Sequence, residues 1–277
     1  ETINYINKVI QLRKEFENNK GIVKHISGDI NPADLGFHKY EVKKLGDKFV
    51  LFSEPHLITM GIGFGVCFLL IFLGFFTERK QAFAKTIAVL VLGVKIAELI
   101  YRYKYYGESV AQLLPLHLCP MVIIISIFMM FFHSEVLFQP VYFWCMGAFF
   151  AIIMPDIKEG MHDFASQSFF ITHFFILFSA AYAFIHFRFR PTKTGFIMSF
   201  LLLISLAFMM YFVNIKLGTN FLFVNRPPSS AAKLIDYVGP WPYYLYSIVG
   251  IYILLSFILY LPFKRNKKSK YGSWKKY

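Results

Sequence analysis

The sequence predicts an all-α fold, a polytopic membrane protein with seven transmembrane helices in a bundle and a polar site near one face. Hydrophobic residues make up 57% of the chain and charged residues only 16%, and the mean hydropathy is +0.52. A chain this apolar cannot hide its surface in one soluble core. It also contains seven apolar runs, each close to the roughly 20 residues with which a helix crosses a bilayer. Helices are expected because a helix satisfies its own backbone where no water is present.

The seven runs follow one another along the chain with mostly short polar connections. They cover residues 57–76, 82–101, 113–132, 136–154, 167–187, 195–213 and 241–262. Ser53 and Pro55 precede the first run at positions that suit an N-cap and a first helical turn. Pro115 is expected at the first helical position of the third run. The connection 214–240 has 27 residues, and its aromatic and apolar content predicts a folded lid on the outer face.

The chain divides into three predicted parts. Residues 1–48 form a polar extension, in which isoleucines near helical spacing predict a short amphipathic helix on the membrane face. Residues 49–262 form the seven-helix transmembrane domain, and residues 263–277 form a basic tail. No cleavable signal precedes the first run, so that run is expected to act as the targeting signal.

The distribution of charge argues for a membrane protein and against nucleic-acid binding. The net charge is +13, and seven of the 29 lysines and arginines lie in the tail directly after the last run. A basic tail beside a membrane is typical of a cytoplasmic segment that faces anionic lipid. The expected inner side carries twelve lysines and arginines and the outer side ten. We therefore expect a multi-pass protein of the cell membrane with a cytoplasmic C-terminus and with membrane phospholipids as partners; the oligomeric state stays open.

The stretch 112–121, QLLPLHLCPM, places the most reactive groups of the chain beside prolines. The amino end of a helix has free N–H groups and a partial positive charge, which favour a thiolate and an oxyanion at Cys119. His117 lies about 200° away from Cys119 on a regular helix, so a direct pair needs a distorted turn. The plain alternative is that Cys119 is a small buried hydrophobe. All three cysteines fall inside apolar runs, which excludes a disulfide scaffold.

Other polar groups are expected towards the same side of the membrane. His173 lies near the outer start of the fifth run, and Lys95, Glu98 and Arg102 follow the 3,4 spacing of one helix face. Such groups inside a membrane face the bundle and find partners, although an ion pair that only locks helices together is an equal alternative. His56 before the first run and Asp156 after the fourth run are further supporting candidates, and the plain alternative for Asp156 is capping or solvation.

A nucleophile, a base and a carboxylate are the parts that acyl transfer needs. Histidines and carboxylates with a cysteine also suit a metal, but the chain has no HExxH or CxxC spacing, and no glycine-rich phosphate loop is present either. We therefore expect neither a metal nor a cofactor. An enzyme predicts one convergent cluster, whereas a carrier predicts polar groups spread towards both faces.

Several segments in order carry a resemblance to a known family. They are FSEPH, LPLHLCP, MPD, THFF, NFLFVNRPP and GPWPYY, within residues 49–262. The chain resembles the bacterial YwaF family of integral membrane proteins, whose eukaryotic relative is transmembrane protein 164. That eukaryotic member is regarded as a phospholipid acyltransferase that acts through cysteine and histidine.

The resemblance implies a role for each candidate residue. Cys119 would be the nucleophile and His173 the base, with His117 or Glu98 in support. Asn220, Trp241 and Tyr244 would close the site or contact a phosphate or glycerol, although Trp241 also suits an interfacial aromatic belt. The predicted function is a lipid-modifying acyltransferase or transacylase that acts on phospholipid esters. The alternative is a non-catalytic transporter or lipid-binding protein with a polar intramembrane pocket.

Overall fold

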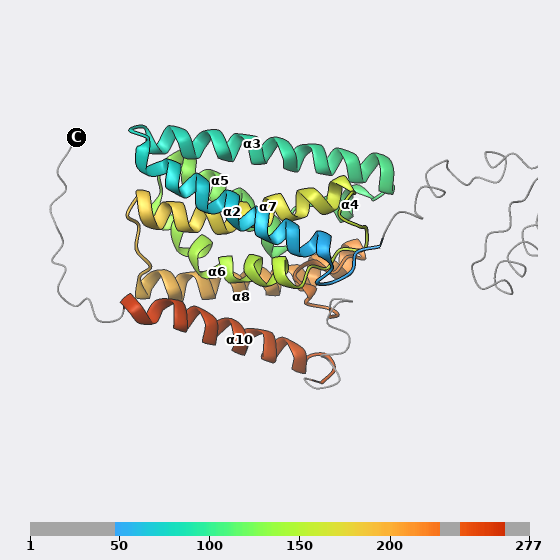
Figure 1. The fold of residues 1–277 in the computed structure, drawn as a ribbon. Coiled ribbons are helices and arrows are strands. Elements are labelled where there is room, and N and C mark those ends of the chain that lie inside the picture. Colours follow the sequence, from blue (N-terminus) through green and yellow to red (C-terminus); the bar gives the residue numbers. More distant parts are fainter. Residues whose placement is uncertain (1–47, 228–238, 264–277) are drawn as a thin grey trace, which may run out of the picture. The chain divides into compact units, whose positions relative to one another are not determined.

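The structure is a computed structural model, and it describes residues 48–227 and 239–263 (Figure 1). Each of the seven apolar runs corresponds to one long helix, and the described residues contain no strand. The predicted all-α fold is confirmed. The long helices are α2 (Glu54–Phe76), α3 (Lys80–Tyr101), α5 (Leu118–Phe132), α6 (Glu135–Ile153), α7 (Phe164–His186), α8 (Lys193–Leu217) and α10 (Tyr243–Tyr260).

Five of these helices are long and apolar enough to cross a membrane: α2, α6, α7, α8 and α10 with the short turn that continues it to Phe263. The other two depart from that pattern for visible reasons. Helix α3 carries Lys85, Lys95 and Glu98 within its apolar run, and α5 has only 15 residues. The chain is therefore a multi-pass membrane protein.

Helix α7 forms the centre of the bundle. It packs against α2, α3, α5 and α6, and two thirds of its most apolar stretch is buried. Ser179 of α7 donates to the Ser126 hydroxyl of α5 at 3.0 Å, which satisfies two polar groups inside the core. The largest fully buried side chains around this helix are Phe138, Phe143, Trp144, Phe178 and Tyr182.

The outer helices present apolar side chains to their surroundings. Phe68 of α2 is 73% exposed, Phe208 of α8 is 69% exposed and Tyr246 of α10 is 69% exposed. So much exposed apolar surface is unstable in water and suits hydrocarbon. The exposed faces of these three helices are therefore suited to contact with lipid.

The bundle has two chemically different ends. We call one the polar end; there α3 finishes and α5, α7 and α10 begin, on the right of Figure 1. At the opposite end the connections carry Arg79, Arg188 and Arg190. At this end Gln139 of α6 holds the connection between α7 and α8: its side-chain amide donates to Arg190 O at 3.0 Å and accepts from Thr192 N at 3.0 Å.

The start of α2 follows the prediction, and the start of α5 does not. Ser53 occupies the N-cap position of α2 and Pro55 its first turn. Pro115 does not start the third long helix: it lies in a break between α4 (Val110–Leu113) and α5. Pro120 stands in the first turn of α5 instead, where its missing N–H costs nothing.

The break at residues 114–117 lies within the depth of the bundle. Helix α5 has 15 residues and so spans about 22 Å, whereas the 23 residues of α2 and α7 span about 34 Å. Non-helical backbone at membrane depth occurs where it is buried in protein or lines a cavity. The break therefore marks the polar end as the place for a site.

The predictions for residues 1–47 and for the tail from residue 264 lie outside the described residues. This includes the amphipathic helix expected in the polar extension and the basic segment expected in the cytoplasm. Residues 228–238 of the expected lid are also outside the described part of the chain.

Candidate functional site

A network of ion pairs lies near the end of α3, in the polar end of the bundle. The Lys95 ammonium lies 2.5 Å from Glu98 Oε2, and Arg102 Nη1 lies 3.1 Å from Glu98 Oε1. Ser168 of α7 donates to Glu98 Oε2 at 3.2 Å. Glu98 is only 5% exposed, and two cations and a hydroxyl compensate its buried charge. The 3,4 spacing seen in the sequence thus produces a connected cluster that joins α3 to α7.

The chain leaves α3 through a π-helix, η3 (Arg102–Tyr106), which redirects the side chains that follow. Arg102 grips Glu108 with two parallel hydrogen bonds, from Nε at 3.1 Å and from Nη2 at 2.6 Å. This fork is the strong geometry for a guanidinium and a carboxylate. Gly107 ends the π-helix with a φ of 66°, a value that glycine adopts without strain. Arg102 therefore closes the turn and holds Glu98 at the same time.

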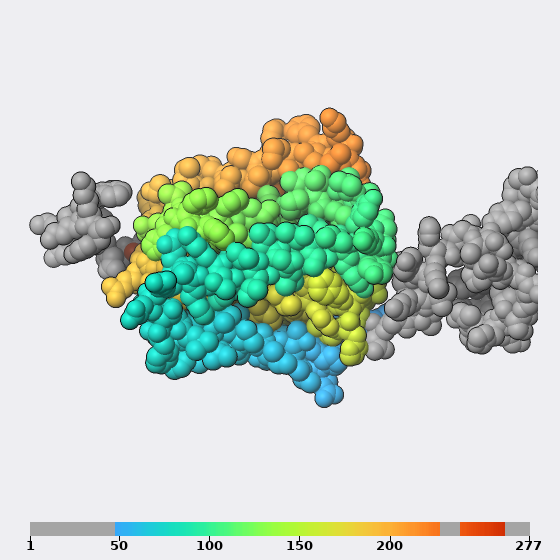
Figure 2. Space-filling view, turned by 90° about the horizontal axis from the view of Figure 1, so that it is seen from above, coloured from blue at the N-terminus to red at the C-terminus, as the bar shows by residue number. Residues whose placement is uncertain are grey.

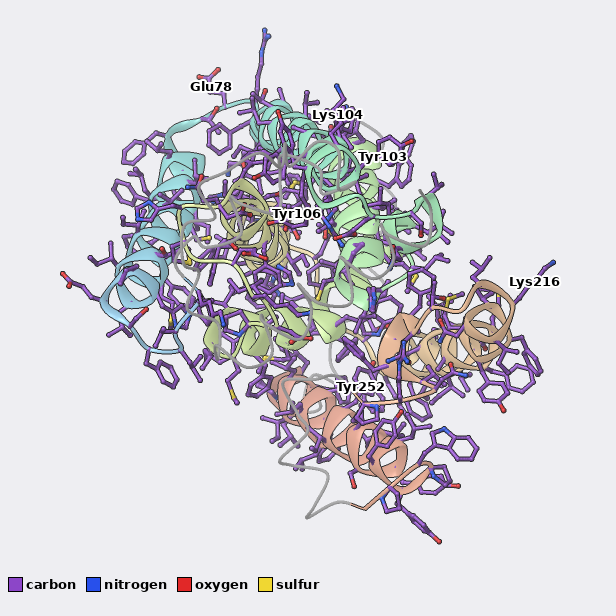
Figure 3. All side chains as sticks on the ribbon, turned by 90° about the vertical axis from the view of Figure 1, so that its right-hand side faces the viewer. Glu78, Tyr103, Lys104, Tyr106, Lys216 and Tyr252 are labelled. Carbon is purple, nitrogen blue, oxygen red and sulfur yellow. The ribbon has the colours of Figure 1, made fainter. Side chains whose placement is uncertain are left out.

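Asp163 ties this turn to the start of α7. As the N-cap residue it accepts from the N–H groups of Ala165 and Ser166, and it also accepts from the hydroxyls of Tyr101 at 2.9 Å and Tyr106 at 2.6 Å. In Figure 3 Tyr106 points into the bundle, while Tyr103 stands at its edge. Burial, and then the hydrogen bond to Asp163, raise the pKa of Tyr106, so its hydroxyl stays a donor.

His173 lies on α7 inside the bundle and is 6% exposed. Its Nδ1 lies 2.6 Å from the carbonyl oxygen of Phe169, and its ring stacks on the Phe169 ring at 3.9 Å between centroids. A carbonyl only accepts, so the hydrogen must be on Nδ1 and the lone pair on Nε2. The hydrogen bond and the ring contact thus hold the His173 side chain in one orientation.

Cys119 lies in the first turn of α5, one residue after the helix begins, and is half-buried. Lys95 is within electrostatic range of both the Cys119 thiol and the His173 imidazole. Among the described residues, no hydrogen bond joins Cys119 to His173 or to His117. Lys95 of α3, Cys119 of α5 and His173 of α7 therefore lie in the same region of the bundle. The Cys119 thiol and the His173 imidazole are not hydrogen-bonded to each other.

His117 is the N-cap residue of α5, but its side chain makes no capping bond. Its ring packs between Phe221 at 5.2 Å and Phe223 at 5.1 Å. These phenylalanines belong to η4 (Phe221–Phe223), a turn in the connection between α8 and α10. The sequence predicted a lid from this connection, and its described part does cover His117.

The three candidates for substrate binding all donate hydrogen bonds to backbone carbonyls of the connection between α8 and α10. Asn220 donates to Arg226 O at 2.8 Å, Trp241 donates to Val224 O at 3.1 Å, and Tyr244 donates to Phe223 O at 2.6 Å. Their polar atoms are thus engaged with the backbone of the same chain. They hold the turn that contacts His117, and contact with a substrate stays a prediction.

The two remaining candidates are His56 and Asp156. His56 is fully buried; its Nδ1 accepts from Phe52 N at 3.1 Å, and its Nε2 donates to Ile152 O at 3.0 Å. With both nitrogens engaged, it fastens α2 to α6 and has no lone pair for chemistry. Asp156 is exposed and lies within electrostatic range of His117.

Sequence reasoning missed several residues that shape the polar end. Ser168 and the two tyrosines that bond Asp163 were not considered, because their partners are 57 to 70 residues away along the chain. Asn214 was missed too; it is buried at the end of α8 and accepts from Phe221 N at 2.6 Å. In residues 48–227 and 239–263, no three His, Cys, Asp or Glu side chains gather as metal ligands would.

Comparison with known proteins agrees with this architecture. The chain is 27% identical over 230 residues to an uncharacterized protein of Treponema pallidum (strain Nichols), and the match covers 80% of this chain and 93% of that relative. No solved structure matches. The model of the TMEM164 family matches residues 51–260, which include every long helix of the bundle. The chain therefore belongs to the TMEM164 family.

Proposed function

We propose that this protein is a membrane-embedded acyltransferase or transacylase that moves an acyl chain between phospholipid hydroxyls through a thioester on Cys119. One observation supports the proposal: Cys119, His173 and Lys95 come from three different helices and lie in the same half of the bundle. Lys95 from α3 reaches both Cys119 on α5 and His173 on α7 electrostatically. A transport path across the membrane requires polar groups along its whole depth. Cys119 lies at the start of α5, Lys95 six residues before the end of α3 and His173 nine residues into α7, so these three groups occupy only the half of the bundle nearer the polar end.

The chemistry follows from the tautomer of His173. Nε2 takes the proton of the Cys119 thiol, and the sulfur attacks the ester carbonyl carbon of a phospholipid. The carbon–oxygen ester bond breaks, and the departing lysophospholipid oxygen receives that proton from Nε2. An acceptor hydroxyl then gives its proton to Nε2 and attacks the thioester, which returns the acyl chain to an oxygen and the proton to the sulfur.

The start of α5 suits the oxyanion of this reaction. The N–H groups of Leu118 and Cys119 have no partner among the described residues, and Pro120 has no N–H to offer. Two free N–H groups beside the nucleophile are the usual donors of an oxyanion hole. The positive end of the helix dipole and the charge of Lys95 add to the same stabilisation.

The proposed proton transfer requires the Cys119 thiol and the His173 imidazole to move closer together when the substrate binds. Catalytic hydrogen bonds are often long in the absence of substrate and tighten when it binds. The turn at Phe221 and Phe223 covers His117, so we propose that a phospholipid headgroup displaces this turn. Asn220, Trp241 and Tyr244 would then hold the displaced connection near the headgroup.

We place the polar end at the outer face of the cell membrane and the C-terminus in the cytoplasm. Support comes from the lysines and arginines of the whole sequence, of which the expected inner side carries twelve and the outer side ten, because basic connections favour the cytoplasm. Cysteine substitutions at exposed sites test this orientation. Lys104→Cys at the polar end should react with a membrane-impermeant maleimide on intact cells, and Glu78→Cys only after lysis; the reverse pattern overturns it.

Purified protein in lipid nanodiscs tests the proposed activity. A labelled acyl chain should move from a diacyl phospholipid to an added lysophospholipid. Cys119→Ala should abolish the transfer, and Cys145→Ala should retain it, since Cys145 lies on α6 and donates to Tyr142 O. Equal transfer by the wild type and Cys119→Ala would reject the covalent mechanism.

A non-catalytic lipid-binding protein is the second candidate function. It is favoured by the lack of a hydrogen bond between Cys119 and either imidazole in the described residues. This alternative predicts that the protein binds lysophospholipid in the nanodisc assay without moving any acyl chain. It also predicts that His173→Gln changes the affinity for lipid, whereas Cys119→Ala leaves it unchanged.

A further inference from the structure

A groove runs along the outside of the bundle between α2 and α3. Both helices pack on α7, but few contacts join them to each other, and α7 is visible between them in Figure 2. The cavity volume is about 230 Å³. Val91, Phe175 and Phe178 form its buried floor, while Ile62 and Ile171 form a rim that is 62% and 44% exposed. The groove is thus open to the outside along its length.

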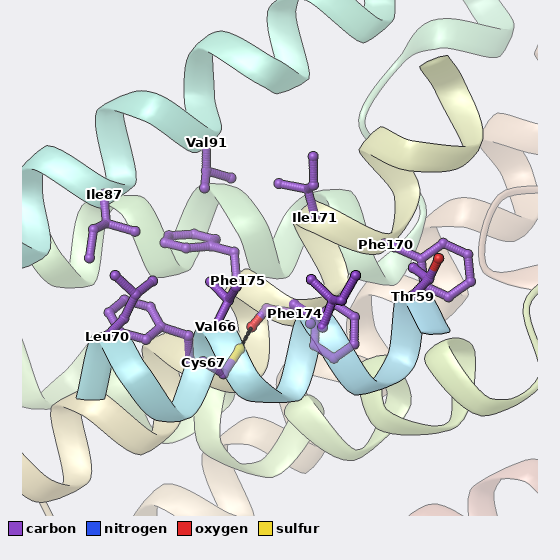
Figure 4. A pocket seen from close by; sticks show the side chains of 13 residues that line it. Thr59, Val66, Cys67, Leu70, Ile87, Val91, Phe170, Ile171, Phe174 and Phe175 are labelled. Carbon is purple, nitrogen blue, oxygen red and sulfur yellow. Dashed lines mark hydrogen bonds between the residues drawn. The ribbon is translucent and has the colours of Figure 1, made fainter. Parts of the chain in front are cut away.

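The wall of the groove offers no free polar group. Its lining contains two polar side chains, and both bond to backbone carbonyls. Cys67 donates to Phe174 O at 3.5 Å, as Figure 4 shows, and Thr59 donates to Pro55 O at 2.8 Å. Water or a polar ligand would lose hydrogen bonds on entering such a space. The occupant must therefore be apolar.

The groove lies at the depth of the hydrocarbon core. On α2 its lining extends from Thr59 to Leu70, which corresponds to about 16 Å along the helix axis. The groove ends about 8 Å and about 9 Å inside the two ends of α2. The hydrocarbon core of a bilayer is about 30 Å thick, so headgroups do not reach this depth. Outside the protein, only lipid chains are present there.

We infer that this groove binds one hydrocarbon chain of a bilayer phospholipid. The exposed rim continues the lipid-facing surface of α2, so a chain enters sideways without crossing a polar barrier. Apolar cavities of about 150 Å³ accept a benzene molecule, and this groove is larger and elongated. A bound chain restores the van der Waals contacts that the exposed floor lacks.

This lipid site is separate from the proposed catalytic cluster. Phe170, Phe174 and Phe178 of α7 line the groove, and His173 does not. On a helix His173 projects about 160° away from Ile171 and Phe175, and about 60° away from Phe170. Helix α7 therefore stands between the groove and the imidazole. The chain in the groove is a bound lipid and not the chain that the enzyme transfers.

Photolabelling tests the inference on the purified protein in nanodiscs. The probe is phosphatidylcholine with a diazirine midway along one chain, and labelled residues are identified by mass spectrometry. Label should appear on Val91 and Phe175, which are 7% and 3% exposed and are reached only from inside the groove. Val66→Trp at the groove should remove this label, and Leu69→Trp on the same helix outside the groove should retain it.

The outcomes separate the possible occupants. Label confined to exposed side chains, or floor labelling that persists equally in both variants, overturns the inference. Cross-links from the floor to a second copy or another protein would identify a protein as the occupant instead. Ile171→Trp serves as the second plug if Val66→Trp does not fold. The readout needs no turnover, so it stays informative even if the protein transfers no acyl chain.

Discussion

Removing the Asp163 carboxylate should destabilise the folded protein at the polar end. Asp163→Ala deletes the acceptor for two backbone N–H groups and for two tyrosine hydroxyls. Loss of an N-cap costs about 1 kcal/mol. Each hydroxyl that donates to a charged acceptor contributes at least about 1.5 kcal/mol. The free energy of unfolding should therefore fall by about 4 kcal/mol, within the non-additivity expected of neighbouring bonds.

Variants of single tyrosines measure how much each tyrosine hydrogen bond contributes to the loss of stability in Asp163→Ala. Tyr106→Phe removes one hydrogen bond of 2.6 Å to a charged acceptor and should cost about 1.5 kcal/mol. Tyr103→Phe is the matched control, because Tyr103 lies in the same π-helix and is 57% exposed. Its effect should stay within about 0.5 kcal/mol.

Unfolding in mixed micelles titrated with a denaturing detergent, followed by tryptophan fluorescence, measures these differences. A double-mutant cycle between Asp163→Ala and Tyr106→Phe should show a coupling energy above about 0.5 kcal/mol. The reasoning fails if Asp163→Ala costs less than about 1 kcal/mol, or if Tyr103→Phe costs as much as Tyr106→Phe.

The same unfolding assay tests two further predictions, and hydrogen exchange tests a third. Glu98→Gln leaves two cations without their buried counter-charge and should cost about 3 kcal/mol; a neutral result would show that the network is solvated. Gly63→Ala places a methyl group against the Phe174 ring, whereas Gly65→Ala meets open space. The first should cost about 1–3 kcal/mol and the second less than about 1 kcal/mol, and equal effects contradict the packing of α2 on α7. Tyr244→Phe should speed hydrogen exchange in the turn that covers His117, and unchanged exchange would mean that other bonds hold the turn.

The sequence was most informative about the helices. Apolar runs of membrane length predicted each long helix, because in hydrocarbon the backbone has few alternatives. The third run shows where hydropathy fails. Leu114, Leu116 and Leu118 are as apolar as any helix residue, so the break before α5 does not alter the pattern. The sequence predicted a helix start at Pro115, whereas α5 begins at Leu118 with Pro120 in its first turn.

The candidate site was predicted in part. The spacing of Lys95, Glu98 and Arg102 indicated one charged face, and the structure joins all three through Glu98. The contact between Asp163 and Tyr106 was not predictable, since it joins residues 57 positions apart. The role of Tyr244 was also hidden, because a hydrogen bond to a backbone carbonyl has no signature in side-chain composition.

The most direct test of the central claim is to trap the acyl-enzyme. Protein incubated with a labelled diacyl phospholipid, quenched in acid and digested should carry the acyl group on the peptide that contains Cys119. Hydroxylamine should release the label, as it does from a thioester, and His173→Gln should slow its formation. Turnover without any acyl group on Cys119, or an acyl group on Cys145 instead, would contradict the account.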